Sequence, residues 1–195
     1  MMPALPVEDD RTDEELEPGL LARCRERDPA ALRAFVERYQ RPVFALLSRM
    51  LGQVPEVEDL AQETFLRAFR ALPSFDLQGA ARPSTWLLTI ATRLALDGYR
   101  RLSRKRALGS VELEPADPAS PEQELEQAEL RRAIARAVAA LPIDQRAAFV
   151  LSEFHAMSIA DIARALDAPE STVKTRLFRA REKLSRALAP YRGAL

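Results

Sequence analysis

Two short amphipathic segments lie between Ser158 and Leu184, with room for only a brief turn at Asp167 and Ala168 between them. The first segment opens on Ser158, a candidate N-cap, with Asp161 three residues later as its acidic capping partner. Its apolar face comprises Ile159, Ile162, Ala163 and Leu166. The second segment follows Pro169, and its apolar positions are spaced by four, three and four: Val173, Leu177, Ala180 and Leu184. Helices joined so closely predict a helix-turn-helix.

The rest of the chain has the same helical character. It holds only 6 glycines in 195 residues, and its long stretches of Ala, Leu, Glu and Arg favour helices. Strand-type alternation of Val, Ile, Thr and aromatic residues appears nowhere at length. The sequence therefore predicts an all-α fold, and a hydrophobic content of 47% is enough to form a core.

Cys24 and His155 are the single cysteine and the single histidine. A single cysteine excludes an intramolecular disulfide framework, so we expect a reducing compartment. One cysteine and one histidine cannot supply the four ligands of a structural zinc, and we expect no metal and no cofactor. The N-terminal residues lack the basic-then-apolar order of a signal peptide, and no window approaches 18 uninterrupted apolar residues. We therefore expect a cytoplasmic protein without membrane insertion.

Charge is unevenly distributed along the chain, although 29 Lys and Arg balance 29 Asp and Glu. Residues 1–18 carry seven acids and one base, and residues 111–129 carry seven acids and no base. Residues 93–106 carry six bases and one acid, and residues 164–186 carry seven bases and three acids. A net charge of zero thus conceals two basic segments, which are compatible with a nucleic-acid partner.

Composition divides the chain into two small helical domains joined by a flexible linker. We interpret residues 1–24 as an acidic disordered tail and residues 107–121, which contain three prolines, as the linker. Residues 25–106 then form the first domain and residues 122–195 the second, which contains the helix-turn-helix.

Three helices are expected in the first domain. Asp28 is a candidate N-cap and Pro29 occupies the first helical position of the first helix. Another helix is expected from about residue 56 to 72, and a long one begins near Ser84 and ends in the basic run that closes at Arg106.

The second helix of the helix-turn-helix leaves a polar and cationic face outward, with Ser171, Lys174, Thr175, Phe178 and Arg179. Such hydroxyls and cations can reach base edges and phosphates in a major groove. A surface helix with solvated basic residues is the alternative. The tight turn and the small residue Ala163 favour DNA binding.

Two further patterns lie in the first domain. Asp59, Gln62 and Glu63 share one face of their helix, which suits either solvent or a basic protein partner. In the long helix Trp86, Arg93 and Arg100 recur every seven residues, with Asp97 and Arg104 beside them. An aromatic ring with cations is a combination that binds single-stranded nucleic acid, although a buried Trp86 with a basic cap is an equal alternative.

Taken together, these patterns resemble the extracytoplasmic-function (ECF) sigma factors, two-domain initiation subunits of bacterial RNA polymerase in the sigma-70 family. The resemblance covers residues 28–106 and 125–188 in the expected order. The residues that carry it are Asp59 to Phe65, Trp86-Leu87, Ile90-Ala91, Asp97, Arg100-Arg101, Leu141-Pro142, Gln145-Arg146 and Thr172 to Arg181.

The resemblance implies an initiation factor that directs core polymerase to promoters and assists their melting. It implies that the clamp helices of the largest polymerase subunit are bound by Asp59, Gln62, Glu63 and Phe65. It assigns the melted start-proximal promoter element, from which a base is extruded, to Trp86, Arg93, Asp97, Arg100, Arg101 and Arg104. It assigns the upstream element, read as duplex, to Ser171, Thr172, Lys174, Thr175, Arg176, Phe178, Arg179 and Arg181.

The resemblance also implies partners and one departure. RNA polymerase core, promoter DNA and an anti-sigma factor are the implied partners. Many family members carry asparagine where this chain has Arg93, so its base preference at the melted element is expected to be unusual.

Two other classes stay open from the residues alone: a stand-alone regulator that uses the helix-turn-helix as a dimer, and a protein-interaction adaptor without DNA binding. Because no nucleophile, base and orienting group can be assembled, we do not expect an enzyme.

Overall fold

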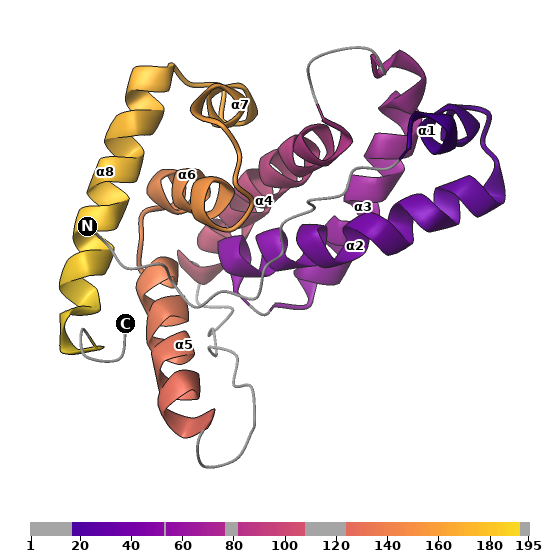
Figure 1. Cartoon of the computed structure of the whole chain (residues 1–195). Coiled ribbons are helices and arrows are strands. Elements are labelled where there is room, and N and C mark those ends of the chain that lie inside the picture. Colours follow the sequence, from indigo (N-terminus) through magenta and orange to yellow (C-terminus); the bar gives the residue numbers. More distant parts are fainter. Residues whose placement is uncertain (1–16, 53, 77–81, 108–123, 192–195) are drawn as a thin grey trace.

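The computed structural model describes residues 17–52, 54–76, 82–107 and 124–191 (Figure 1). No strand occurs within these ranges, and the all-α prediction is confirmed. The α-helices are α1 (Pro18–Arg25), α2 (Pro29–Leu51), α3 (Glu56–Ala71), α4 (Pro83–Ala107), α5 (Glu124–Ala139), α6 (Ile143–Glu153), α7 (Ile159–Ala165) and α8 (Glu170–Ala187). Short 3-10 helices follow α3 (η1, Leu72–Ser74) and α8 (η2, Ala189–Tyr191).

Helices α2, α3 and α4 pack together as the N-terminal half (Figure 1). An aromatic cluster joins α2 to α3, because the fully buried Phe35 ring lies at centroid distances of 4.8 Å from Tyr39, 6.3 Å from Phe65 and 5.7 Å from Phe69. These edge-on contacts add to the burial of apolar area and fix the two helices against each other. Leu87, Ala91 and Leu94 of α4 are buried in the same core.

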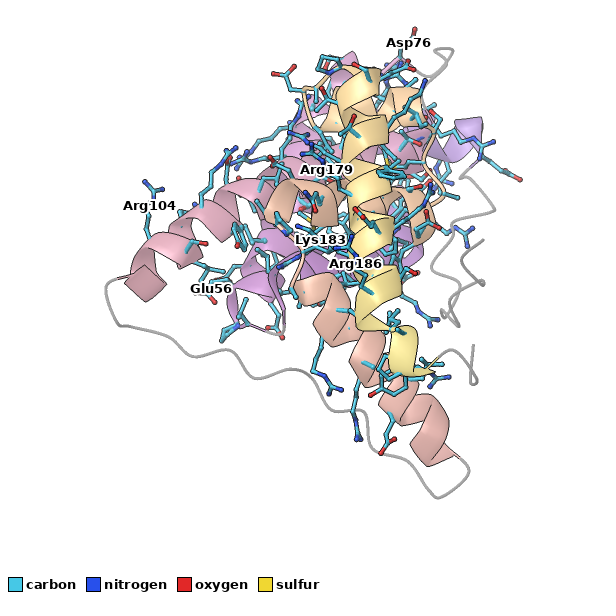
Figure 2. The ribbon with its side chains drawn as sticks, turned by 90° about the vertical axis from the view of Figure 1, so that its left-hand side faces the viewer. Glu56, Asp76, Arg104, Arg179, Lys183 and Arg186 are labelled. Atoms are coloured by element: carbon cyan, nitrogen blue, oxygen red, sulfur yellow. The ribbon has the colours of Figure 1, made fainter. Side chains whose placement is uncertain are left out.

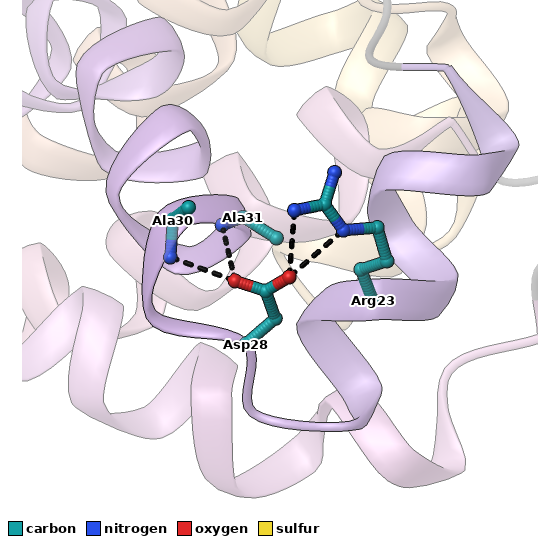
Figure 3. A network of polar contacts seen from close by, with 4 residues as sticks. All are labelled: Arg23, Asp28, Ala30 and Ala31. Carbon is teal, nitrogen blue, oxygen red and sulfur yellow. Dashed lines mark hydrogen bonds and ion pairs between the residues drawn. The ribbon is translucent and has the colours of Figure 1, made fainter.

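The start of α2 follows the predicted cap (Figure 3). One carboxylate oxygen of Asp28 accepts hydrogen bonds from the backbone N–H groups of Ala30 at 2.8 Å and Ala31 at 3.3 Å. The other oxygen accepts from the Arg23 guanidinium at 2.6 Å and 2.8 Å. The hydrogen bond from Arg23, then those from the backbone, lower the pKa of Asp28. The same side chain thus caps α2 and joins it to α1.

Helix α1 corrects the prediction that all of residues 1–24 are disordered. Leu21 and Cys24 are buried against the N-terminal half, with relative exposures of 4% and 2%. Arg25 donates through Nε to the Leu72 carbonyl at 3.3 Å and through its guanidinium to the Phe75 carbonyl. Two apolar residues three positions apart are enough for one buried helical stripe. Residues 1–16 lie outside the described residues.

Helices α5 to α8 form the C-terminal half, which contacts the N-terminal half directly. Helix α6 packs on the end of α2, and α7 packs on α4. The guanidinium of the buried Arg146 in α6 donates to the Met50 carbonyl of α2 at 2.6 Å. The sequence predicted two domains on a flexible linker. Nearly all of that segment, residues 108–121, lies outside the described residues, but the two halves share a packed interface.

Candidate nucleic-acid interface

Helices α7 and α8 form the predicted helix-turn-helix. Ser158 caps α7 by accepting a hydrogen bond from the Asp161 N–H at 3.1 Å, and its hydroxyl donates to the Asp161 carboxylate at 2.6 Å. The turn places Asp167 at φ 47°, in the left-handed region that aspartate tolerates better than most residues. The four predicted core positions of α8 are all buried: Val173, Leu177, Ala180 and Leu184.

The outward face of α8 carries most of the side chains assigned to duplex DNA (Figure 2). Exposed side chains on it are Ser171, Lys174, Thr175, Phe178, Arg179 and Arg181. Phe178 is 70% exposed, an unusual position for a large apolar ring. Thr172 and Arg176 are half-buried. An exposed ring among hydroxyls and cations can contact a thymine methyl while its neighbours reach phosphates.

Carboxylates of α6 hold two of these arginines. Asp144 pairs with Arg176 at 3.2 Å, and Glu153 pairs with Arg181 at 2.6 Å. Among the described residues Lys174 and Arg179 have no carboxylate partner, so their charges are available to an incoming phosphate.

A hollow of about 380 Å³ lies between the first turn of α6 and the first turns of α8. It is lined by Pro142, Asp144, Gln145, Ser171, Thr172, Thr175, Arg176 and Arg179. The first three were not among the predicted DNA-contacting residues, although Pro142 and Gln145 were part of the family resemblance. Only the packing of α6 against α8 brings them to this face.

The stripe predicted along α4 is only partly exposed. Arg93, Asp97, Arg100, Arg101 and Arg104 are exposed, but Trp86 is half-buried. Its ring is tilted by 34° against Phe75 at a centroid distance of 4.7 Å. The exposed part of the stripe is therefore mainly cationic.

Local contacts orient several of these arginines. Arg100 pairs with Asp97 at 3.0 Å, and the Arg104 Nε donates to the Arg100 carbonyl at 3.2 Å. Figure 2 shows Arg104 projecting from α4 near its C-terminal end. Arg93 instead donates to the carbonyl of Arg164 in α7 at 3.2 Å.

On α3, Asp59 and Gln62 are exposed and Glu63 is half-buried. Arg67 donates a hydrogen bond to Glu63 at 2.7 Å and thereby lowers the pKa of that carboxyl. Phe65, grouped with them from the sequence, is 8% exposed and lies in the aromatic cluster, so its placement on the face is corrected. Leu66, which sequence reasoning missed, is 49% exposed on this side, seven residues after Asp59.

Within the described ranges, no three His, Cys, Asp or Glu side chains come close enough to hold a metal ion. The same residues contain no helix long and apolar enough to cross a membrane.

The two halves match two regions of one protein family. Residues 35–105 match Sigma-70 region 2, and residues 131–184 match Sigma-70, region 4. The chain is 33% identical over 187 residues to the RNA polymerase sigma-H factor of Pseudomonas aeruginosa, covering 91% of this chain and 96% of that protein. It is 34% identical over 183 residues to the ECF RNA polymerase sigma-E factor of Escherichia coli, and this match covers 88% of this chain and 93% of that protein.

Solved structures agree with this match. CnrH, solved in complex with the cytosolic domain of CnrY, is 26% identical with a TM-score of 0.63, covering 89% of this chain and 97% of that one. RpoE of Bartonella quintana, solved with the anti-sigma factor NepR, is 23% identical with a TM-score of 0.62. The match covers 80% of this chain and 96% of that one, and it shows a similar fold. The chain belongs to the ECF sigma factors of the sigma-70 family and is a promoter-specific transcription initiation factor of RNA polymerase.

Proposed function

We propose that this sigma factor works through three separate surfaces: the α3 face for core polymerase, the α4 stripe for melted DNA and the α8 face for duplex DNA. The observation that carries the proposal is the α8 face, where the exposed Phe178 ring shares a surface with Lys174 and with Arg179, which lines the hollow. The protein supplies recognition and binding energy, and the polymerase carries out the chemistry. Because it acts on the chromosome, we place it in the cytoplasm.

On the α8 face, Lys174 and Arg179 bind phosphates, and Phe178 contacts a base edge. Each phosphate contact releases about one counterion, so Lys174→Ala is expected to weaken duplex binding uniformly across sequences and to reduce the salt slope of log K by about 1. Fluorescence anisotropy over a salt series measures this slope. An unchanged slope would remove Lys174 from the interface. Lys183→Ala, farther along α8, is a control of equal charge.

On α3, Asp59, Gln62 and Leu66 form the docking face for the clamp helices of the largest polymerase subunit. An exposed leucine beside acidic side chains suits a partner that offers both an apolar patch and basic residues. Leu66→Asp is expected to abolish pull-down of core polymerase and leave duplex binding intact. Binding of core by Leu66→Asp with wild-type affinity would contradict this role.

On α4, the cations Arg100, Arg101 and Arg104 follow the phosphates of the melted strand. The half-buried Trp86 ring, which packs on the buried Phe75, presents its exposed surface to an unstacked base. Arg101→Ala is expected to impair initiation from a duplex promoter, while a promoter with a pre-opened bubble restores activity. Equal loss on both templates would argue against a role in melting.

The whole proposal is tested by run-off transcription from genomic templates with core polymerase, with and without the chain. Initiation at defined starts only when the chain is present is the expected result. Absence of any such start, with duplex binding retained, would favour a stand-alone regulator.

An anti-sigma protein is the proposed regulatory partner, because CnrH was solved with the cytosolic domain of CnrY and RpoE with the anti-sigma factor NepR. Affinity purification of the tagged chain from its own cells, followed by mass spectrometry, is expected to recover such a protein in addition to polymerase subunits.

A further inference from the structure

Helix α1 belongs to none of the three proposed surfaces, yet it is joined to one of them by a series of contacts. It lies beside the C-terminal end of α3 and packs on α2 and η1 (Figure 1). Its last residue, Arg25, is half-buried. Arg25 donates through Nε to the Leu72 carbonyl at 3.3 Å and through its guanidinium to the Phe75 carbonyl. A single side chain of α1 thus binds both ends of the turn that follows α3.

The backbone of this turn and the guanidinium share one acceptor. The Phe75 N–H donates to the Leu72 carbonyl at 3.1 Å, and the same oxygen accepts from Arg25. The last carbonyls of a helix have no partner within the helix, and a charged donor binds them more strongly than a neutral one. The side chains of Leu72 and Phe75 are also buried, at 1% and 8% exposure. Arg25 therefore fixes a turn that is already anchored in the core.

The turn carries the ring on which Trp86 packs. The centroids of the Phe75 and Trp86 rings lie 4.7 Å apart, and the ring planes are tilted by 34°. The attraction between two rings depends on their relative geometry, so a shift of Phe75 changes the contact with Trp86. Trp86 is only half-buried. The position of Phe75 thus determines the direction in which the exposed part of the Trp86 ring points.

We propose that Arg25 is a positioning residue for Trp86, which it orients through the backbone and ring of Phe75. Helix α1 thereby contributes to capture of the melted strand without contacting DNA. The inference rests on the proposed role of the Trp86 ring in binding an unstacked base.

Arginine suits this position better than lysine. Its planar guanidinium presents several donors in a fixed fork and can bind two carbonyls at once, whereas a lysine ammonium is a compact charge on a flexible stem. Arg25→Lys keeps the charge and loses the forked contact, and Arg25→Gln loses both. Arg23→Gln is the matched control, because Arg23 lies in the same helix and makes a forked contact with Asp28 instead.

The first measurement uses Trp86 itself, which is the only tryptophan in the chain, so that its fluorescence reports its own surroundings. Arg25→Gln is expected to shift the emission to longer wavelength and to increase quenching by acrylamide. Arg25→Lys is expected to change both in the same direction by less, and Arg23→Gln to change neither. Unchanged emission and quenching in Arg25→Gln, or an equal change in Arg23→Gln, would overturn the proposal.

Far-UV circular dichroism verifies that each variant has folded. If Arg25→Gln does not fold, Arg25→Lys provides the same comparison at unchanged charge, and wild-type fluorescence in Arg25→Lys would then overturn the proposal.

The second measurement asks whether Arg25 acts on the strand through Trp86. The full chain is titrated into a fluorescent single-stranded oligonucleotide of mixed sequence and followed by anisotropy. A base stacked on an aromatic ring contributes a factor of about five or more to affinity, so Trp86→Leu is expected to lose about that factor and Arg25→Gln a part of it. In the Trp86→Leu background, Arg25→Gln is expected to have no further effect.

The outcomes separate the two proposals. An equal loss from Arg25→Gln in both backgrounds would mean that Arg25 acts on the strand through its own charge, and it would overturn the positioning role. Full single-strand affinity in Trp86→Leu, together with altered Trp86 fluorescence in Arg25→Gln, would refute the proposed role of Trp86 in binding a base. The orientation of Trp86 by Arg25 would still stand.

Discussion

Acidification is expected to destabilise the fold through His155, the single histidine of the chain. Its side chain lies just after α6 and is buried, and neither ring nitrogen has a hydrogen-bond partner among the residues that the structure describes. Burial, and then the nearby charge of Arg49, lower the pKa of His155 from 6.5 to about 3. The folded protein therefore holds a neutral imidazole throughout the mildly acidic range.

The sign of the effect follows from proton binding. Above pH 6.5 the imidazole is neutral in both the folded and the unfolded chain, so pH has no effect through this group. Below pH 6.5 the unfolded chain binds a proton that the folded chain excludes, and stability falls until the pH approaches the folded pKa. At pH 5 the loss amounts to about 2 kcal/mol, since each pH unit contributes about 1.36 kcal/mol.

Urea unfolding followed by circular dichroism at pH 7.5 and pH 5 measures this loss. His155→Gln cannot titrate, so its free energy of unfolding is expected to fall by about 2 kcal/mol less than that of wild type between the two pH values. The pKa values of Asp28 and Glu63 are lowered, so these two groups affect the free energy of unfolding at lower pH. Their effect is the same in wild type and in His155→Gln. The same pH dependence in wild type and His155→Gln would refute the reasoning.

Further substitutions test particular sites. Ser158→Ala removes the cap of α7 and is expected to lower the free energy of unfolding by about 1 kcal/mol, with Ser158→Thr restoring most of it in thermal unfolding. Phe178→Ala is expected to change stability by less than about 0.5 kcal/mol, yet to reduce the ratio of promoter to mixed-sequence duplex affinity in competition anisotropy. Phe65→Ala is expected to lower the free energy of unfolding by about 3 to 5 kcal/mol in urea unfolding, whereas Leu66→Asp leaves it unchanged. A larger loss of stability for Leu66→Asp than for Phe65→Ala would place Phe65 on the docking face.

Local features were readable from the sequence because they depend on residues close together in the chain. The caps at Asp28 and Ser158, the turn at Asp167 and the buried stripe of α8 all involve neighbours within one or two helical turns. Capping needs a particular side chain at a particular position, and amphipathic spacing needs only the helical period. The same signals led to the helix-turn-helix and, with the upstream motifs, to the sigma family.

Phe65 was misplaced because an aromatic residue within a motif can serve either the core or a partner. Its neighbours Ala61, Thr64 and Ala68 are buried at helical spacing, which places Phe65 on the inner side of α3. The short helix α1 was missed for a different reason, since its burial depends on contacts with α2 and η1, which the local pattern does not contain.

Tertiary structure alone determined how the two halves meet. By composition Arg146 would be expected at the surface, but its guanidinium is buried because a carbonyl 96 residues away, at Met50, accepts its hydrogen bond. Arg93 belongs by sequence to a nucleic-acid stripe, and only packing places it against α7. The sequence by itself thus determined most of the helices and their buried faces, and it predicted three candidate surfaces. How the two halves pack depends on contacts between residues far apart in the chain, and these exist only in the folded protein.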